Sequence, residues 1–501
     1  MKILSNQQIR EADAYTIEHE PITSIDLMER ASKAFVTWFT QYFTPKEIIT
    51  VVCGTGNNGG DGLAISRLLS EKGFVVKTVI LNEQAKRSQD FSINLEHLSS
   101  KGTITWVNKS ADFTGHIFEN SIIIDAIFGS GLSRAAEGLY AEIIEIINQS
   151  HCTVISVDIP SGMFTDSTSK SIPMIVADHV LTFQSPKLAF FVAENYAHIK
   201  QWHLADIGSH SGFIDQLAVD FEYLQAHDIG HKLVPRGKFS HKGNFGHVLM
   251  LAGSIGKIGA AMLTSKAILR TGSGLLTCHL PACGYIAMQT ALPEAMVSVD
   301  DNEHYLSGMP DLEPYDAIGV GPGLGTAVEI EHLLQQLFTS IKCPLVIDAD
   351  AINVLAKNQL LRKTLPKGAV LTPHPGEFKR LAGSWANDFE KLALQRDFAR
   401  QHQVVIVLKG AYTSIANTDG TLYFNSTGNP GMATGGSGDV LTGIIASLLG
   451  QGYPALDAAL IGVYLHGLAG DLAAGEQGEI SLIASDIVDK ISDAFRQITL
   501  M

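Results

Sequence analysis

The sequence has few of the features that mark secreted, membrane-bound or disulfide-rich proteins. Its 501 residues include only five cysteines, and none of them forms a C-x-x-C pair. Their odd number and wide scatter predict reduced, mostly buried thiols at Cys53, Cys152, Cys278, Cys283 and Cys343. No run of 18 apolar residues occurs, and the opening stretch, MKILSNQQIREADAY, has no apolar segment of signal length. We therefore expect a cytoplasmic protein with no membrane partner.

An excess of positive charge is also absent. Asp and Glu number 51 against 36 Lys and Arg, which gives a formal net charge of −15. No Lys- or Arg-rich run interrupts this acidic composition. Proteins that bind nucleic acids or anionic membranes do so through clustered basic side chains. We therefore expect no nucleic-acid partner.

The length and the order of apolar runs predict two α/β domains. In the first half, runs such as IITVVCG, SIIIDAIFG and TVISVDIPSG alternate with helix-patterned stretches, and HVLMLAG, PLVIDADAIN and VVIVLKGAY do so in the second half. This alternation is typical of parallel sheets with crossover helices. The pattern is lost in LADIGSHSGFIDQLAVDFEYLQAHD. We therefore place the domain boundary near residue 215, between domains of residues 1–215 and 216–501.

A glycine-rich stretch after the first long apolar run, GTGNNGGDG, resembles a dinucleotide-binding loop but departs from it. Gly54, Gly56 and Gly59 satisfy the G-x-G-x-x-G spacing, followed by a helix expected from Gly62. The acidic residue expected at the end of the next strand is missing, because that strand ends in Asn82. Asp61 also places a carboxylate at the predicted helix start, where an anion would bind. These departures argue against an ordinary pyrophosphate site.

Polar side chains also follow two other apolar runs in the first half. Asp125 and Asp158 each end a predicted strand, and both are expected at the sheet edge beside the glycine-rich stretch. Asn58, Asp125 and Ser161 would offer only oxygen ligands, which suits a hard cation and not a transition metal. The alternative is that the two aspartates only cap local structure.

The second half contains the stretch TGNPGMATGGSGDVLTG, which predicts an anion site. Gly435, Gly436 and Gly438 precede an apolar helix expected to begin near Asp439, so backbone N–H groups and the helix dipole converge there. Asp439 is either a helix cap or a base acting on a substrate hydroxyl. The chain contains no Walker A sequence, so this is not a P-loop.

Three further strand ends in the second half carry candidate residues. His374 lies between two prolines, and it either contacts a ligand or has only a structural role. Lys409 ends a strand before a glycine, where it either binds nucleotide phosphate or ribose or is solvated. Asp348 and Asp350 follow another strand, and the alternative for Asp350 is that it caps a helix.

In their order along the chain, these motifs resemble those of the bifunctional NAD(P)H-hydrate repair enzymes. The resemblance rests on GNNGGDG, DAIFGSGLSR and VDIPSG in the first half, followed by GSIGKIGAA, GPGLG, DADAIN, TPHPGEF, LKGAYT and NPGMATGGSGDVLTG. It implies an N-terminal Rossmann-like three-layer sandwich and a C-terminal ribokinase-like α/β/α domain. It also implies an epimerase for the R and S forms of hydrated NADH and NADPH, joined to a dehydratase that restores the S form at the expense of ADP, releasing AMP and phosphate.

The resemblance also implies roles for individual residues. Asp439 and Asp158 are the expected catalytic groups, and Asn58, Asp125 and Ser161 are the expected ligands of a potassium ion. A magnesium ion is expected with ADP at the dehydratase site. The expected contacts of the hydrated nucleotide are Asn57, Asn58, Gly59, Gly60, Asp61, Gly129, Ser130, Gly131, Leu132, Ser133, Arg134, Ala260, Gly323 and His374. Those of the adenine nucleotide are Lys409, Gly410, Ala411, Tyr412, Thr413 and Gly438.

Some expectations remain open at this level. Ser32 stands where the family usually has glycine after LMERA, and we interpret this as a local packing change. We expect a homo-oligomer, although composition alone does not decide the oligomeric state. GGSGD would equally suit a ribokinase-like small-molecule kinase fused to a binding domain, which is the alternative function. A further alternative is that the first domain is a non-enzymatic interaction module, because the same fold serves binding roles in other proteins.

Overall fold

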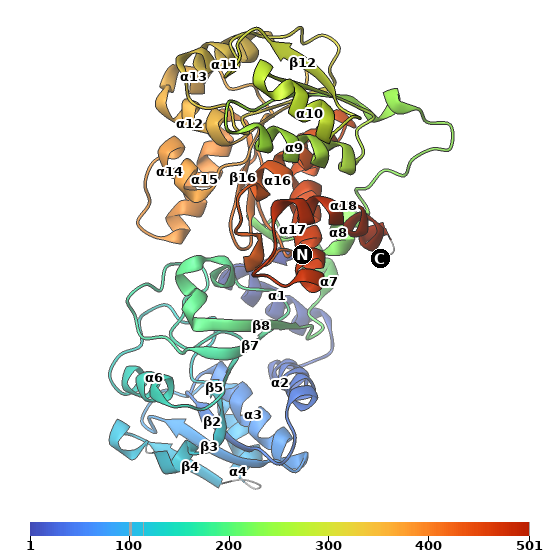
Figure 1. The fold of residues 1–501 in the computed structure, drawn as a ribbon. Coiled ribbons are helices and arrows are strands. Elements are labelled where there is room, and N and C mark those ends of the chain that lie inside the picture. The colour runs from blue at the N-terminus through green and yellow to red at the C-terminus, as the bar shows by residue number, and fades with distance from the viewer. Residues whose placement is uncertain (100–102, 114, 500–501) are drawn as a thin grey trace. The chain divides into compact units, whose positions relative to one another are not determined.

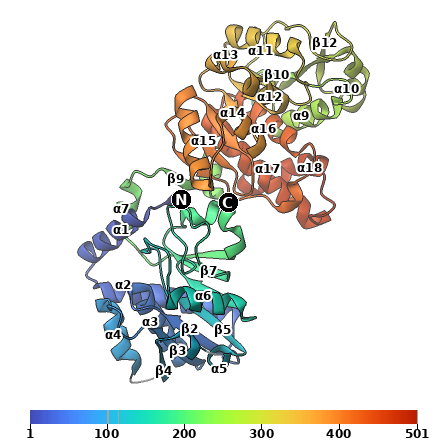
Figure 2. The ribbon, with the colours of Figure 1, turned by 90° about the vertical axis from the view of Figure 1, so that its left-hand side faces the viewer.

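The computed structural model describes residues 1–99, 103–113 and 115–499. The chain forms two compact units. The first unit comprises Lys2–Val219 together with Asn387–Phe389, and the second contains the rest of the chain from Asp220 onward together with Met1. Figure 1 and Figure 2 show each unit as a sheet flanked by helices.

The first unit is built on a parallel sheet. Its strands are β2 (Ile48–Cys53), β3 (Val75–Leu81), β4 (Thr103–Val107), β5 (Ser121–Ala126), β6 (Val154–Val157), β7 (Ala177–Phe183) and β8 (Ile199–Ala205), and β1 (Lys2–Ile3) precedes them. Its helices are α1 (Asn6–His19), α2 (Ser24–Tyr42), α3 (Asn57–Glu71), α4 (Gln89–Ser99), α5 (Gly115–Phe118), α6 (Leu139–Gln149) and α7 (Ser211–Gln216). The strand order β4-β3-β2-β5-β6-β7-β8 reverses direction between β2 and β5.

Alternating side chains on β2 explain the three layers of this unit. Val51 and Cys53 pack into one apolar cluster with residues of α2 and α3, whereas Val52 packs into a second cluster with residues of α6. Because successive side chains of a strand point to opposite faces, a strand that is apolar throughout requires cover on both sides. The predicted Rossmann-like sandwich is therefore confirmed.

The second unit is a larger α/β/α structure. Its strands are β9 (Phe221–Tyr223), β10 (His247–Leu251), β11 (Leu275–Pro281), β12 (Met296–Asp300), β13 (Ala317–Val320), β14 (Leu345–Ile347), β15 (Val370–Leu371), β16 (Val405–Leu408), β17 (Ser414–Ala416) and β18 (Leu422–Phe424). Its helices are α8 (Ala226–Gly230), α9 (Ile258–Thr271), α10 (Tyr285–Ala291), α11 (Val328–Ser340), α12 (Ala349–Lys357), α13 (Gln359–Lys363), α14 (Pro375–Ala382), α15 (Asp388–His402), α16 (Ser437–Gly450), α17 (Ala455–Gln477) and α18 (Ala484–Thr499).

The strands of this unit follow the order β9-β18-β17-β16-β15-β14-β13-β10-β11-β12. The strands from β16 to β12 in this order are parallel to their neighbours, whereas β17 pairs antiparallel with both β16 and β18. Val248 and Met250 of β10 pack in a cluster with α9, α16 and α17, whereas Leu249 and Leu251 pack with α11 and α12 on the other face. The strand order reverses between β10 and β13, as it does between β2 and β5 in the first unit.

Helix α17 is long and apolar enough to cross a membrane by length and composition alone. Its most apolar 18-residue window is 72% buried, however, and its side chains belong to the same core cluster as those of α16 and α18. We therefore assign α17 as a core helix.

The cysteines differ in part from the sequence prediction. All five are free, which agrees with reduced thiols. Cys53 and Cys278 are buried, but Cys152 and Cys343 are only half-buried and Cys283 is exposed. Cys283 lies in a one-turn 3-10 helix after β11, where the chain leaves the sheet and its side chains meet solvent. The prediction of mostly buried thiols was therefore wrong in extent.

Two candidate active sites

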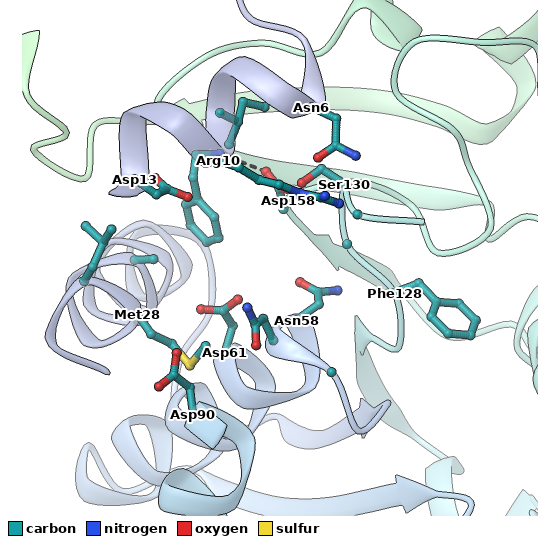
Figure 3. Close-up of a pocket in the computed structure, with 18 of the residues that line it drawn as sticks. Asn6, Arg10, Asp13, Met28, Asn58, Asp61, Asp90, Phe128, Ser130 and Asp158 are labelled. Atoms are coloured by element: carbon teal, nitrogen blue, oxygen red, sulfur yellow. Dashed lines mark hydrogen bonds between the residues drawn. The ribbon is translucent and has the colours of Figure 1, made fainter. Parts of the chain in front are cut away.

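A cavity of about 740 Å³ lies in the first unit where the strand order reverses. Open parallel sheets bind ligands at such reversal points, beyond the carboxyl ends of the strands. Figure 3 shows polar side chains from several elements around this space. The polar and charged residues that line it are Asn6, Arg10, Asp13, Ser24, Thr55, Asn57, Asn58, Asp61, Asp90, Ser130, Tyr140, Asp158, Gln184 and Lys187.

The glycine-rich stretch brings α3 close to the sheet. A Cβ on Gly54 would lie 2.1 Å from the carbonyl oxygen of Ile127, and one on Gly59 would lie 1.9 Å from the carbonyl oxygen of Gly54. Only glycine therefore fits at these two positions. The helix begins at Asn57 and not at Gly62 as predicted, because the two glycines after Asn58 continue the helix instead of forming a turn.

Asp61 consequently lies in the second turn of α3 and not at its start. Its carboxyl group lines the cavity. Burial, followed by the charges of Asp158, Asp13 and Asp90, raises its pKa well above the usual range. The higher pKa favours the protonated form of Asp61, which donates a hydrogen bond and carries no charge against an anionic ligand. The raised pKa therefore weakens the repulsion between Asp61 and an anionic ligand that the sequence suggested.

Asp158 forms a buried ion pair at the end of β6. Lys187 Nζ lies 2.9 Å from Asp158 Oδ1, and the lysine side chain is only 1% exposed. Thr182 Oγ1 also donates to Asp158 Oδ1 at 3.1 Å. Burial, the largest single influence, would raise the pKa of this carboxyl, but the Lys187 charge together with hydrogen bonds from Lys187, Phe183 N and Ser130 lowers it. Asp158 is therefore held ionised at a cavity wall, with a left-handed backbone φ of 68°.

Asp125 lies deeper, at the end of β5, and is completely buried. It accepts hydrogen bonds from Ser156 Oγ (2.8 Å) and from the backbone N and Oγ of Ser161 (2.9 and 2.5 Å). No basic side chain in the described ranges bonds to it, and burial raises its pKa. The backbone N of Phe128 donates to Ser161 Oγ at 2.8 Å. This neighbourhood is therefore rich in oxygen and carries a carboxylate without a paired cation.

The expected substrate residues of the first unit are only partly brought to the cavity. Asn57, Asn58, Asp61, Asp158 and the segment 129–132 line it. Gly129 packs against Asn58, because a Cβ there would lie 3.2 Å from Asn58 Cβ. The residues that do not line the cavity wall are Gly59, Gly60, Ser133 and Arg134. Ser133 and Arg134 are exposed, and the two glycines are buried inside the helix packing.

Sequence reasoning missed several residues of this cavity. Lys187 is the last residue of the stretch HVLTFQSPK, four residues after β7 ends, so its position after a strand was a usable signal. Asn6, Arg10 and Asp13 come from α1, whose sequence contains no glycine motif or strand end. The sequence of α1 therefore gave no signal that these residues would line a cavity.

The second candidate site lies at the reversal point of the other sheet, between the loops after β10 and β13. Gly253 N donates to the carbonyl of Pro322 at 2.8 Å, and Ser254 Oγ donates to that of Gly323 at 2.6 Å. A Cβ on Gly323 would lie 3.2 Å from Ala260 Cβ, so these two expected substrate residues are neighbours. The positive φ of 65° at Gly323 permits this turn.

The N-terminus of α16 faces the same edge. The helix begins at Ser437, after Gly436 with a left-handed φ of 90°, so Asp439 is its third residue and not its cap. A Cβ on Gly438 would lie 3.1 Å from Lys409 Nζ. The lysine charge and the free N–H groups of the first helical turn therefore lie together, as the sequence predicted for an anion site.

Charged side chains surround this helix start. Lys409 Nζ lies 2.9 Å from Asp348 Oδ1, and Thr442 Oγ1 donates to Asp348 Oδ2 at 2.7 Å. Burial, followed by the charge of Asp348, raises the pKa of Asp439 to about 7, although Lys409 acts in the opposite direction. Asp439 thus exchanges protons near neutral pH, which suits a general base.

The remaining expected residues have clear local roles. His374 Nδ1 accepts from the backbone N of Gly376 at 3.0 Å and caps α14, and its side chain remains half exposed. Thr413 Oγ1 donates to the carbonyl of Gly410 at 2.9 Å and closes the turn 410–413. Asp350 accepts from Gly325 N at 2.8 Å and pairs with Lys257, so it joins two loops and does not cap α12.

His466 is a further residue that sequence reasoning missed. It comes from α17 and is buried, and its Nε2 lies 3.3 Å from Ser437 Oγ at the start of α16. Burial lowers its pKa to about 4, so the ring is neutral at neutral pH. Its position in an apolar helix gave no signal of this contact.

Comparisons with known proteins agree with this architecture. Residues 24–189 match the family model of the YjeF-related protein N-terminus, and residues 248–493 match that of NAD(P)H-hydrate dehydratase. The bifunctional NAD(P)H-hydrate repair enzyme Nnr of Moorella thermoacetica is 36% identical over 99% of this chain and 97% of its own length.

Two solved structures resemble the second unit. A ribokinase-like superfamily protein of Enterococcus faecalis is 28% identical, with a TM-score of 0.51 over 57% of this chain and 99% of its own. ADP/ATP-dependent NAD(P)H-hydrate dehydratase of Bacillus subtilis, co-crystallized with ATP and Mg²⁺, is 34% identical over 56% of this chain and 100% of its own, with a TM-score of 0.49. The ribokinase-like fold is therefore confirmed, and the chain belongs to the bifunctional NAD(P)H-hydrate repair enzymes, which join an NAD(P)H-hydrate epimerase to an ADP/ATP-dependent NAD(P)H-hydrate dehydratase.

Proposed function

We propose that the chain interconverts the R and S forms of hydrated NADH and NADPH in its first unit and dehydrates the S form in its second unit. The dehydration would consume ADP and release AMP and phosphate. The observation that carries this proposal is the presence of two separate sites, each at the reversal point of its own sheet and each with an aspartate of shifted pKa. A kinase fused to a binding module, the alternative, would not need a proton-transfer group in the first cavity.

For the epimerase, the cavity wall supports binding of the hydrated nicotinamide nucleotide. Asn57, Asn58 and the segment 129–132 offer amide and backbone groups, and the raised pKa of Asp61 favours the form that offers a hydrogen-bond donor. Ionised Asp158 would take a proton from the substrate, because Lys187 keeps the carboxylate charged. Gly59, Gly60, Ser133 and Arg134 do not line the cavity. We propose that they contact the substrate only through backbone groups or at the outer rim of the site.

We propose Asn58, Asp125 and Ser161 as ligands of a potassium ion. The support is the completely buried Asp125, which has no basic partner, together with the surrounding oxygen atoms. Amide, carboxylate and hydroxyl oxygens suit a hard cation and not a transition metal. A bound potassium ion would supply the missing countercharge and fix the loop that carries Ser161.

For the dehydratase, Asp439 would act as a base on the hydroxyl at C6 of the hydrated ring. Hydroxide is a poor leaving group, and phosphoryl transfer to this oxygen would create a good one. The N–H groups at the start of α16 and the Lys409 ammonium would stabilise the moving phosphoryl charge. Loss of phosphate then restores the dihydropyridine ring. Ala260, Gly323 and His374 would contact the hydrate.

We propose that ADP binds beside Lys409, with the turn of Gly410, Ala411, Tyr412 and Thr413 and with Gly438 as its other contacts. The closed turn and the anion-binding helix start support this assignment. A magnesium ion bound with ADP would neutralise charge on the transferring phosphate. Lys409, the turn 410–413 and Gly438 would contact the nucleotide itself and not the magnesium ion.

The organisation of the whole protein follows from these assignments. We propose that the activities divide near residue 215, as residues 1–215 and 216–501, which the break in packing after Val219 supports. We also propose that the protein is a cytoplasmic homo-oligomer.

One assay tests the proposed function. The full chain is incubated with separated R and S hydrates, with and without ADP, and NADH absorbance and phosphate are followed. Both hydrates should yield NADH and free phosphate only when ADP is present. Accumulation of a stable phosphorylated product instead of NADH would favour the kinase alternative, and repair of the S form alone would remove the epimerase assignment.

A further inference from the structure

Helix α1 forms one wall of the epimerase cavity although it lies outside residues 24–189, the range matched by the N-terminal family model. The residues that it contributes recur at helical spacing and share one face: Asn6, Ile9, Arg10, Asp13, Ala14 and Ile17. Ala12 and Thr16 are buried on another face.

Asp13 stands out on this face. Its carboxyl group accepts no hydrogen bond and forms no ion pair within the part of the chain that the structure describes. The side chain is half-buried, and carboxylates that lose part of their contact with water normally have such partners, because unpaired burial is costly. Helix capping does not explain it either, since Ser5 and Gln8 already form the capping box of α1. The side chain therefore has a position in the cavity without a structural partner.

Asp13 and Asp158 reach the cavity from different elements. Figure 3 shows Asp13 on α1, Asp158 after the sheet strand and Asp61 on α3, around the same space. Asp158 is committed to Lys187, whereas Asp13 has no lysine of its own. The two carboxyl groups therefore occupy unequal environments within one cavity.

We propose that Asp13 is a second proton-transfer group of the epimerase, acting together with Asp158 on the hydrated ring. This proposal rests on the proposed epimerase function of the first unit.

The chemistry of the substrate requires two such groups. C6 carries a hydroxyl group and is bonded to the ring nitrogen N1, so it is a hemiaminal carbon. When Asp158 takes the hydroxyl proton, C6–O becomes C=O and the C6–N1 bond breaks, while Asp13 donates a proton to N1. Rotation about C5–C6 exposes the other face of the carbonyl. N1 then attacks that face, returns its proton to Asp13, and the C6 oxygen recovers its proton from Asp158, so no oxidant or co-reactant is needed.

The surrounding charges support this division of roles. Burial, followed by the charge of Asp158, raises the pKa of Asp13 to about 6, and Lys187 opposes this shift. The pKa of Asp158 is lowered. Two carboxyl groups with separated pKa values can serve as acid and base in the same pH range. The charged and titratable groups that face Asp13 are Arg10, Asp61, Asp90, Asp158 and Lys187.

The test replaces Asp13 in the full-length chain by the isosteric asparagine. Asp13→Asn should lower kcat for R-to-S conversion by roughly 10²–10⁴-fold, the usual contribution of a proton-transfer group, with KM close to that of wild type. ADP-dependent conversion of pure S hydrate by the same chain should be unchanged, and it serves as the internal control. Glu11→Gln is the matched variant, because it makes the same chemical change at an exposed residue of α1 outside the cavity.

A pH profile separates proton transfer from a structural role. Asp13 donates only when protonated, so wild-type R-to-S conversion should fall as pH rises through about 6. Asp13→Asn should lose this alkaline limb, whereas Glu11→Gln should keep it. If Asp13→Asn does not fold, Asp13→Glu, which keeps the carboxyl group, should retain the limb with a reduced kcat.

The outcomes are distinct. A wild-type chain that cannot convert R hydrate would refute the proposed epimerase function itself. A wild-type chain that converts R hydrate, combined with an Asp13→Asn chain of equal kcat and an unchanged pH profile, would overturn the role of Asp13. An Asp13→Glu chain without the alkaline limb would overturn it as well.

Discussion

Each of the two sites holds a lysine beside several aspartates, but the two lysines have different partners. Lys187 pairs with Asp158, the proposed catalytic group of the first unit. Lys409 pairs with Asp348, a neighbour of the proposed base Asp439. The pKa of Asp158 is consequently lowered, whereas that of Asp439 is raised to about 7. Similar residues on similar sheets thus give opposite protonation behaviour.

This difference suits the two reactions. An epimerase that exchanges protons with two substrate atoms benefits from one carboxylate that is charged before the reaction and a second carboxyl group that holds a proton. A phosphoryl acceptor needs a base with a pKa near the working pH and a cation beside the phosphate. Asp348 accepts a hydrogen bond from Lys409 through one carboxylate oxygen and from Thr442 through the other. These bonds hold the lysine ammonium beside Gly438. The partner of the lysine therefore determines what each aspartate can do.

The largest expected effect comes from removing the base of the second site. Asp439→Asn should lower ADP-dependent conversion of S hydrate by roughly 10²–10⁴-fold, because the hydroxyl proton loses its acceptor. R–S interconversion, followed by chromatographic separation of the hydrates, should stay at the wild-type rate. Dehydration at the wild-type rate would exclude Asp439 as the base, and a parallel loss of epimerisation would show that the two sites are not independent.

Breaking the ion pair of the first site should affect both activity and stability. Asp158→Asn leaves the buried Lys187 charge unpaired, so we expect a loss of about 3–5 kcal/mol in the unfolding free energy of this unit, together with persistence of R hydrate. Thermal or urea unfolding and the hydrate assay measure the two effects separately.

A second substitution separates these effects. Adding Lys187→Met to Asp158→Asn removes the unpaired charge and should recover most of the lost stability, because a buried pair is often replaceable by apolar groups. Epimerisation should stay lost, since the carboxylate is still missing. If the double variant regains epimerisation, Asp158 serves only to neutralise Lys187.

Potassium should affect the first site alone. Replacing potassium by choline should slow epimerisation and leave dehydration of S hydrate unchanged. Potassium at about 100 times its dissociation constant should stabilise the first unit by about 2.7 kcal/mol, measured by thermal unfolding. Asp125→Asn should abolish this stabilisation, because it removes the buried carboxylate charge. A stabilisation that persists in Asp125→Asn would place the ion elsewhere.

The sequence predicted the parts of the fold that depend on strong local patterns. Apolar runs such as Ile48–Cys53 are covered on both faces, so their strand assignment followed from composition alone. The sequence did not predict strands β11 and β12, since polar residues such as Thr277, His279 and Ser298 interrupt their apolar pattern. The helix start at Asn57 was also missed, because Gly59 and Gly60 favour a turn locally, whereas in the structure they pack closely against Gly54 and Met28 within the helix.

The candidate sites show the same limit. Residues after strands, such as Asp158 and Lys409, were found because parallel strands end at one sheet edge. Asp13 and His466 lie on helices, and only the tertiary structure decides which helical face meets a site. The pKa of Asp61 could not be predicted either, since it depends on partial burial in the cavity wall and on three carboxyl groups distant in sequence.

The smallest expected effect is a shift in a pH profile of the second site. Asp439 must be ionised to accept a proton, so dehydration should be present above its pKa and should be lost as pH falls through about 7. Asp348→Asn removes the nearest charge that raises this pKa and also frees Lys409, whose charge lowers it. Both changes act in one direction, so the acid limb should move to lower pH by about one unit, the lower end of the effect of one nearby charge.

Asp350→Asn is the matched comparison for this shift. Asp350 raises the pKa of Asp439 less than Asp348 does, and its own partner is Lys257 and not Lys409. Its acid limb should therefore move in the same direction but by less, as measured by kcat for S hydrate between acidic and neutral pH at saturating ADP. An acid limb that stays near pH 7 in Asp348→Asn would mean that burial alone sets the pKa of Asp439. The choice of partner for Lys409 would then not explain why the two aspartates differ.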